Sequence, residues 1–196
     1  MIIKTLSAKT FRNYNSLSIN FSPSVTFISG NNGVGKTNIL EAISMLAYMK
    51  SFRNIHDREI IQWGNSSYYC LAEVEESFNK KFELGFSIHN KVAQKKAKID
   101  NKEVTNVADY YGKLLVVIFS PVDINLINGT PDLRRKYFDS VISKIDSKYL
   151  TNLNEFKKIL ASRNKLLKSF NGNYSNGNEL KVWDELFASK AEMLIN

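Results

Sequence analysis

One segment, Gly30 to Thr37, constrains the fold of this chain more than any other part of it. It reads Gly-Asn-Asn-Gly-Val-Gly-Lys-Thr and matches the phosphate-loop pattern G-x-x-x-x-G-K-[ST]. Before it, residues 25–29 are apolar and β-branched, as in a buried strand, and after it residues 37–49 repeat apolar side chains at helical spacing. The sequence therefore predicts an α/β fold of the P-loop NTPase type.

The chemistry of a triphosphate explains this spacing. Because glycine lacks a Cβ atom, the backbone can wrap closely and turn several N–H groups towards an anion. The helix that follows adds the positive end of its dipole. We expect Lys36 to reach the β- and γ-phosphates and the Thr37 hydroxyl to bind Mg²⁺. The expected ATP contacts are Gly30, Asn31, Asn32, Gly33, Val34, Gly35, Lys36 and Thr37.

An ordinary Gly-Asn turn leading into a helix is the competing interpretation of this segment. Three glycines, the Lys-Thr pair and both flanking segments favour nucleotide binding instead.

Composition limits the other classes of function. The chain has 196 residues, of which 43% are hydrophobic, so it can bury a core in one or two domains. It has no apolar run long enough to cross a bilayer and no signal-peptide pattern at its start, so we expect a cytoplasmic protein without membrane contact. One cysteine and two histidines exclude an internal disulfide and argue against a zinc cluster.

Positive charge is concentrated in two stretches. The net charge is +8; residues 131–170 hold ten Lys or Arg against four acidic residues, and residues 91–102 hold five Lys against one Asp. Such clusters suit a nucleic-acid backbone, although a solvated, charged surface would have the same composition. We take Arg134, Arg135 and Lys136 as candidate DNA contacts.

The remaining pattern predicts strands in the first two thirds of the chain. Residues 2–8 and 17–21 are expected strands. Alternating segments at 68–75 and 81–89, followed by a hairpin at 98–104 with Asp-Asn at its tip, predict an antiparallel β-subdomain over about residues 66–105. Residues 114–119 are apolar without alternation, as in a strand covered on both faces.

Helices are predicted beyond this point. Thr130 is a suitable N-cap with Pro131 at the first helical position. A second helix, 147–170, a polar reversal at 171–178 and a returning helix make a helical hairpin. The expected buried face of the first helix is Leu133, Phe138, Val141, Ile142 and Ile145.

We therefore expect an ATP-binding lobe at 1–125 and an incomplete helical arm at 126–196. The last helical pattern stops without a good cap, as in a chain truncated at the C-terminus.

Two parts of a complete ATPase are missing from the sequence. No apolar strand ends in an acidic residue followed by a catalytic Glu, and no Ser-Gly-Gly signature is present. Asp123 follows the apolar segment 114–119 but has no adjacent Glu. The sequence thus predicts ATP binding without efficient hydrolysis.

A succession of motifs resembles the N-terminal part of the RecF family, DNA-repair ATPases related to the heads of SMC proteins. The motifs run in order along nearly the whole chain, which makes them more specific than the phosphate loop alone. They are Phe11-Arg12-Asn13-Tyr14, Gly30 to Asn38, Leu40-Glu41-Ala42, Ser51-Phe52-Arg53, Asp57-Arg58-Glu59, Trp63-Gly64, Phe119-Ser120-Pro121, Asp123, Leu133-Arg134-Arg135, Phe138-Asp139, Arg163-Asn164, Leu166-Leu167-Lys168 and Trp183-Asp184.

The resemblance implies a two-lobed ABC-type head with the helical hairpin in an inserted arm. It further implies an ATP-dependent homodimer that acts at gapped or junction double-stranded DNA, where RecO and RecR help to load RecA. On this resemblance Arg12 and Asn13 would lie near the base or ribose, and Asp123 would lie near the metal. The family's signature and Walker B segments fall in a C-terminal part that this chain does not contain.

The leading hypothesis is an ATP-controlled DNA-binding switch of recombinational repair. An SMC-like ATPase of another class, such as a nuclease-linked phage-defence protein, is the main alternative, and a downstream acidic metal cluster would reveal it. A nucleotide-binding interaction module without a DNA role is the third.

Overall fold

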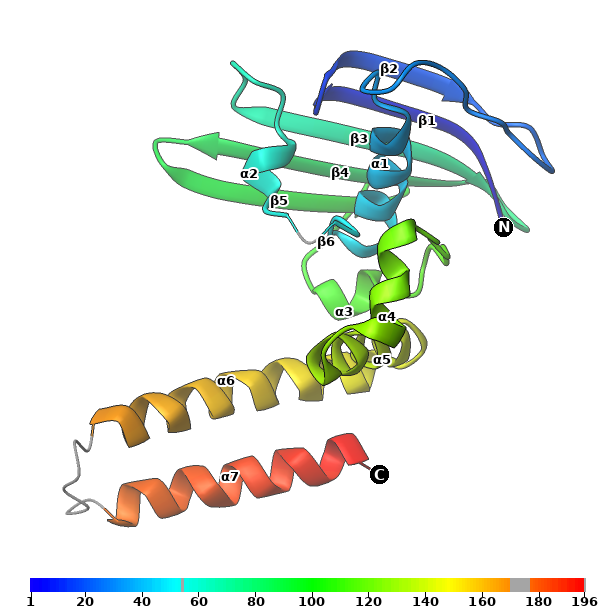
Figure 1. Ribbon diagram of the computed structural model, residues 1–196. Coiled ribbons are helices and arrows are strands. Elements are labelled where there is room, and N and C mark those ends of the chain that lie inside the picture. The colour runs from blue at the N-terminus through cyan, green and yellow to red at the C-terminus, as the bar shows by residue number, and fades with distance from the viewer. Residues whose placement is uncertain (54, 170–176, 196) are drawn as a thin grey trace. The chain divides into compact units, whose positions relative to one another are not determined.

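The computed structural model describes residues 1–53, 55–169 and 177–195 (Figure 1). The chain divides into two compact units, Met1–Ser120 and Pro121–Asn196. The sequence-based division lies between residues 125 and 126.

The first unit is built on one antiparallel sheet of six strands in the order β2-β1-β3-β4-β5-β6. Every strand predicted between residues 2 and 21 or between 66 and 105 is present, and β3 to β6 extend the sheet that β1 and β2 begin. The strands are β1 Ile2–Phe11, β2 Tyr14–Asn20, β3 Ser67–Glu75, β4 Lys80–His89, β5 Val92–Ile99 and β6 Lys102–Val104.

Two tight turns set the register of β4, β5 and β6. Asn90 and Lys91 have positive φ angles, and so do Asp100 and Asn101. Two successive positive φ angles twist a hairpin in the sense that the flanking strands require. The predicted Asp-Asn hairpin tip is therefore confirmed.

The helix α1 (Lys36–Tyr48) packs on one face of the sheet (Figure 1). Alternation along the strands turns every second side chain towards it, and these side chains are buried. Ala42, Met45 and Leu46 supply the matching face of α1. The buried strand residues are Leu6, Ala8, Phe11, Tyr68, Cys70, Ala72, Val74, Phe82, Leu84, Phe86 and Ala97.

Two short helices, α2 (Asp57–Ile60) and α3 (Val107–Tyr110), and the segment around residue 116 lie near the end of α1. The Tyr110 hydroxyl donates to the backbone carbonyl of Leu46, and the Tyr48 hydroxyl donates to that of Val116. The first bond satisfies a carbonyl at the end of α1, and the second ties the chain around residue 116 to that helix.

The two predicted buried strands that flank this core are wrong for the described chain. Residues 25–29 and 114–119 are extended but pair with no strand among the described residues. The side chain of Phe27 is 91% exposed and that of Val117 is 97% exposed, whereas Leu114 is buried. Apolar composition alone does not make a strand, because a strand also needs a hydrogen-bonded neighbour.

The second unit is helical. It begins with a 3₁₀ turn, η1 (Pro121–Ile124), and α4 (Asn125–Asn128), and continues with α5 (Pro131–Ile145), α6 (Ser147–Ser169) and α7 (Gly177–Ile195). Pro131 opens α5 as predicted, although the Thr130 side chain makes no capping bond. Residues 170–176 of the predicted polar reversal lie outside the described residues.

The predicted hairpin of α6 and α7 is confirmed, and its contacts are specific. The rings of Phe156 and Phe187 lie 5.0 Å apart. Arg163 Nε lies 2.6 Å from Asp184 Oδ1, and its guanidinium stacks on the Phe187 ring. These contacts hold the two helices in one register.

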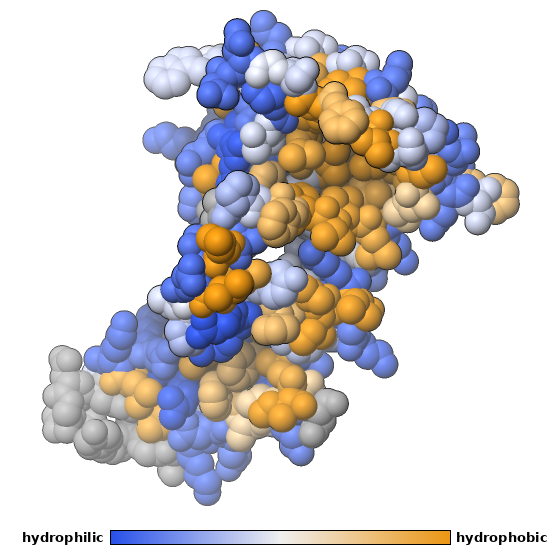
Figure 2. All heavy atoms as spheres, turned by 45° about the vertical axis from the view of Figure 1, so that its right-hand side comes forward, coloured by the Kyte–Doolittle hydropathy of each residue, from blue (hydrophilic) through white to orange (hydrophobic). Residues whose placement is uncertain are grey.

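The predicted buried face of α5 is wrong for the described chain: Val141 is half-buried and the other four residues are exposed. Phe138 is 60% exposed and Ile145 is 83% exposed, because no described element packs over them. The space-filling view accordingly shows apolar surface on both units (Figure 2). None of the helices within the described residues combines the length and the apolarity that crossing a bilayer would need.

Candidate nucleotide-binding site

The loop from Gly30 to Thr37 adopts a backbone that depends on its glycines. Gly30, Gly33 and Gly35 have φ angles of 148°, 84° and 106°. L-residues with side chains rarely adopt such angles. All three glycines of the pattern therefore serve the conformation of the loop, as the sequence predicts.

Lys36 lies across this loop. Its Nζ donates to the backbone carbonyls of Gly30 and Asn31, each at 2.7 Å. An ammonium held there places a positive charge at the mouth of the loop. Thr37, the next residue, is exposed on the first turn of α1, so its hydroxyl is accessible to a ligand.

The start of α1 is electropositive. The N-cap residue is Gly35, which has no side chain that could cap the helix, and the first turn contains no acidic residue. The backbone N–H groups of this turn are therefore not capped by a carboxylate. Together with Lys36 they form a site suited to phosphate oxygens.

The candidate metal ligands divide between the two units. Thr37 belongs to the first unit, whereas Asp123 lies in η1 of the second. The described residues contain no group of three or more His, Cys, Asp or Glu that could hold a metal by themselves. The Thr37 hydroxyl is an exposed oxygen, the type of ligand atom that Mg²⁺ prefers.

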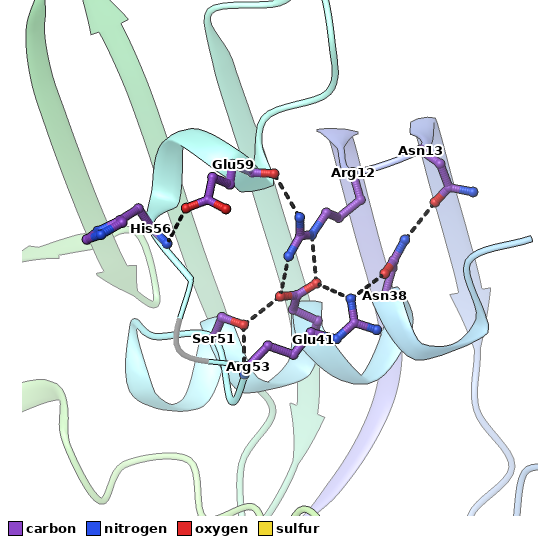
Figure 3. A network of polar contacts seen from close by, with 8 residues as sticks. All are labelled: Arg12, Asn13, Asn38, Glu41, Ser51, Arg53, His56 and Glu59. Atoms are coloured by element: carbon purple, nitrogen blue, oxygen red, sulfur yellow. Dashed lines mark hydrogen bonds and ion pairs between the residues drawn. The ribbon is translucent and has the colours of Figure 1, made fainter. Parts of the chain in front are cut away.

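A buried carboxylate lies directly behind the phosphate loop (Figure 3). Glu41, on α1, has no solvent exposure. Both of its oxygens accept from Arg12, Nε to Oε2 and Nη2 to Oε1, at 2.8 Å each. Ser51 Oγ donates to Oε1 at 2.5 Å, and Arg53 Nη1 lies 3.5 Å from Oε2. The carboxylate is thus fully compensated by charge and hydrogen bonds.

A second set of contacts joins this network to the loop. Asn13 Nδ2 donates to the carbonyl of Val34 at 2.9 Å, and Asn13 Oδ1 accepts from Asn38 Nδ2 at 2.9 Å. Arg53 Nη1 donates to Asn38 Oδ1 at 3.2 Å. The side chains of Arg12 and Asn13 therefore contact the protein itself, on the loop and on the helix that follows it.

Sequence reasoning missed the structural role of Glu41, Ser51 and Arg53. The available signal was a charged residue, Glu41, among apolar residues that repeat along α1. A carboxylate on the buried face of a helix requires partners. The positions of those partners, on a strand end and on the loop after the helix, could not be read from spacing.

The other end of α1 is held by an ion pair. Lys95 Nζ lies 2.8 Å from Asp57 Oδ1 and donates to the carbonyl of Met49 at 2.5 Å. The Tyr68 hydroxyl donates to Asp57 Oδ1 at 2.6 Å. Burial, together with the charge of Asp57, raises the pKa of Tyr68, so this hydroxyl remains a donor.

Comparison with known families identifies the first unit. The model of the RecF/RecN/SMC N-terminal domain matches residues 2–120, which is more than half of the chain. This chain belongs to the RecF/RecN/SMC family.

Individual RecF proteins are similar over the entire chain. The DNA replication and repair protein RecF of Leptospira interrogans is 38% identical over 197 residues, covering 100% of this chain and 53% of that protein. RecF of Limosilactobacillus reuteri is 37% identical, covering 100% of this chain and 52% of that protein. The chain thus spans about half the length of the curated RecF relatives it matches.

Solved structures give the same result. The recombination mediator protein RecF-ATPrS of the RecFOR pathway superimposes with a TM-score of 0.92 at 32% identity, over 98% of this chain and 52% of the other. RecF-ATP superimposes with a TM-score of 0.91 at 33% identity, over 99% and 52%. An Smc head domain from Pyrococcus furiosus, 19% identical with a TM-score of 0.51, covers 98% of this chain and 57% of the other and shares the fold.

The basic side chains of α5 and α6 in this RecF-family chain differ in whether they form ion pairs or hydrogen bonds within the protein. On α5, Arg134 donates to the carbonyl of Gly129 at 3.0 Å, and Lys136 pairs with Asp132 at 2.6 Å. Arg135 is 3.9 Å from the same Asp132. On α6, four exposed lysines form no ion pair with any described residue: Lys148, Lys158, Lys165 and Lys168.

Proposed function

We propose that this chain binds ATP and Mg²⁺ as part of a RecF-like mediator of recombinational DNA repair. The carrying observation is the phosphate loop itself, with three positive-φ glycines and an ammonium across its mouth. RecF structures with TM-scores above 0.9 that are described with ATP support the same nucleotide.

Each loop residue has a distinct role on this proposal. The backbone N–H groups around Gly33 and Gly35 and at the start of α1 donate hydrogen bonds to the phosphate oxygens. Lys36 exchanges its carbonyl partners for the β- and γ-phosphates. The Thr37 hydroxyl would hold Mg²⁺, and the ion, when bound, would supply positive charge that offsets the charge of the phosphates.

Nucleotide binding would control DNA binding through dimerisation of the complete protein. ATP held at the phosphate loop of one copy would be shared with a second copy. The dimer would then engage gapped or junction double-stranded DNA and cooperate with RecO and RecR in loading RecA. The likeness to RecF of the RecFOR pathway supports this role.

The helical unit supplies the cations for the DNA backbone on this proposal. Lys158, Lys165 and Lys168 are available to phosphates because no described acidic side chain pairs with them. The basic side chains of α5 already contact Asp132 or a backbone carbonyl, and these contacts compete with DNA phosphates for Arg134, Arg135 and Lys136. We therefore expect the α6 lysines to contribute more to DNA affinity than the α5 cluster.

The proposal is tested by DNA retention of the full-length protein with and without ATP. Lys36→Ala should lose ATP binding and with it the ATP-dependent part of retention. Lys50→Ala, at an exposed position after α1, is the matched control and should behave as wild type. Equal, ATP-insensitive retention by wild type and Lys36→Ala would reject the switch.

Charge reversal tests the DNA surface separately. Replacing Lys158, Lys165 and Lys168 by Glu should weaken DNA binding and flatten its dependence on salt. The same replacement of Arg134, Arg135 and Lys136 should have a smaller effect. If neither set changes DNA affinity, the chain is better explained as a nucleotide-binding interaction module.

A further inference from the structure

We infer that Asn13 is a positioning residue for the phosphate loop and that the buried Arg12–Glu41 pair holds Asn13 in place. The inference rests on the proposed ATP binding and concerns residues outside the phosphate-loop pattern. It assigns the turn between β1 and β2 to shaping the site from behind, without contact to the nucleotide.

The Asn13 amide joins the two halves of the phosphate cradle. Its Nδ2 donates to Val34 within the loop, and its Oδ1 accepts from Asn38, which follows Thr37 on the first turn of α1. One planar amide therefore sets the distance between the crest of the loop and the start of the helix. Both halves must be in place before their N–H groups can converge on one phosphate.

The same side chain also fills space behind the loop. A Cβ atom built on Gly35 would lie 2.6 Å from Asn13 Oδ1 and 2.8 Å from the Tyr14 hydroxyl. The backbone at Gly35 thus approaches the β1–β2 turn as closely as a residue without a side chain permits. Asn13 therefore limits movement of the loop towards the sheet as well as bonding to it.

Arg12 anchors this turn on both sides. Its φ angle is 56°, and its backbone N–H donates to the carbonyl of Ile60 at 2.7 Å. Its guanidinium makes two bonds to Glu41 and one, from Nη1 at 2.8 Å, to the carbonyl of Glu59. All three guanidinium nitrogens are engaged, so Arg12 is committed to the protein.

Glu41 connects the anchor to the helix that carries the site. It lies one turn after Thr37 on α1, so the turn and the phosphate loop are fixed to the same rigid element. Bidentate pairing fixes orientation as well as distance. The position of Asn13 relative to the start of α1 is therefore set by covalent geometry and two short bonds.

A loop ordered before binding has less conformational entropy to lose when the ligand arrives. Removing the Asn13 amide should therefore weaken phosphate binding about tenfold, as expected for loss of roughly one hydrogen bond and of the ordering it supplies. Because Asn13 is exposed, its truncation should leave the core intact.

The experiment measures dissociation constants of the full-length protein for MgATP and for inorganic tripolyphosphate. Asn13→Ala should raise both constants by the same factor, about tenfold, since positioning acts on the phosphate cradle. The double variant with Asn13→Ala and Asn38→Ala should raise each dissociation constant by less than the product of the factors found for the two single variants, because both substitutions remove the same hydrogen bond. Asn15→Ala, exposed on the neighbouring strand, is the matched control and should change neither constant.

Arg12→Lys keeps the positive charge but loses the bidentate geometry. It should weaken the binding of both MgATP and tripolyphosphate, as Asn13→Ala does. Adding Arg12→Lys to Asn13→Ala should cause little further loss, since Arg12 acts through Asn13. If Arg12→Lys does not fold, the Asn13 and Asn38 variants still decide the question.

Three outcomes would overturn the inference. Wild-type affinity of Asn13→Ala for both ligands would remove Asn13 from the site. If Asn13→Ala lost affinity for ATP but not for tripolyphosphate, Asn13 would instead contact the base or ribose. A wild-type protein that binds neither ligand would reject the proposed function and this inference together, whereas the first two outcomes leave the proposed ATP binding of the wild-type protein standing.

Discussion

The two units of this chain treat their apolar side chains in opposite ways. In Met1–Ser120, the sheet and α1 enclose buried residues from four strands, β1, β3, β4 and β5, and from the helix. In Pro121–Asn196, Leu153 is the buried apolar side chain among the described residues, and the apolar side chains of α5 and α7 are widely exposed. A sheet with a helix across it closes a core from its own pieces, whereas an antiparallel helix pair buries only one stripe of each helix.

Polar contacts follow the same division. The first unit contains a buried carboxylate, Glu41, held by Arg12 from the turn after β1 and by Ser51 and Arg53 from the segment after α1. The second unit has ion pairs at partly exposed positions, such as Arg163 with Asp184. The buried network can define the geometry of a ligand site, while the exposed pairs mainly fix helix register.

The largest expected effect is on the core of the first unit. Phe82→Ala should lower its free energy of unfolding by about 3–5 kcal/mol, because it removes a fully buried ring packed against Tyr110. Urea unfolding followed by circular dichroism measures this. Phe78→Ala, at an 82% exposed position, is the control and should change stability by less than about 0.5 kcal/mol.

The buried carboxylate comes next. Glu41→Gln keeps the shape of the side chain but turns an NH₂ group towards Arg12 and leaves that guanidinium without its counter-ion. We expect a loss of about 3 kcal/mol in unfolding free energy. Glu103→Gln, which removes an exposed partner of Lys96, should cost at most about 0.5 kcal/mol. Equal effects would contradict the distinction between buried and exposed pairs.

A smaller effect is expected in the helical hairpin. Asp184→Asn removes the charge that Arg163 contacts and should cost about 0.5–1 kcal/mol, since both side chains are partly exposed. Faster amide hydrogen exchange in α6 and α7, with unchanged exchange in the sheet, would be the observation. A change spread into β1–β6 would indicate that the two units unfold as one.

The smallest effect is a pH dependence confined to the same hairpin. The hydrogen bond and charge of Lys190 lower the pKa of Glu155 below its ordinary value of about 4.5. The pair therefore stabilises the hairpin above that value, and this contribution disappears as the pH falls through the lowered pKa. An NMR titration of Glu155 should show the lowered pKa in wild type, and Lys190→Met should remove most of the shift.

Local structure could be predicted well from the sequence where it depends on neighbours in the chain. Alternation located the strands of the sheet, and helical spacing located α1, α6 and α7. The Asp100-Asn101 turn was readable because those residues tolerate positive φ angles. The phosphate loop was readable for the same reason, since its glycines and Lys36 act within one short segment.

Predictions that depended on distant partners were less successful. Residues 25–29 and 114–119 have the composition of buried strands, yet Phe27 and Val117 are exposed because no described strand lies beside them. The apolar face of α5 was overestimated for the same reason. Composition reports a tendency to be buried, and only a neighbouring element can satisfy it.

The sequence alone determined that this protein carries a phosphate loop, because a phosphate cradle is specified by a few consecutive residues and the conformations they allow. Only the tertiary structure decided how that loop is supported. Arg12 and Asn13 were expected near the base or ribose, and folding instead brings their side chains onto Glu41, Asn38 and the carbonyl of Val34. The partners of a buried charge come from separate elements that pack together, and the residue spacing within any one segment does not predict this packing.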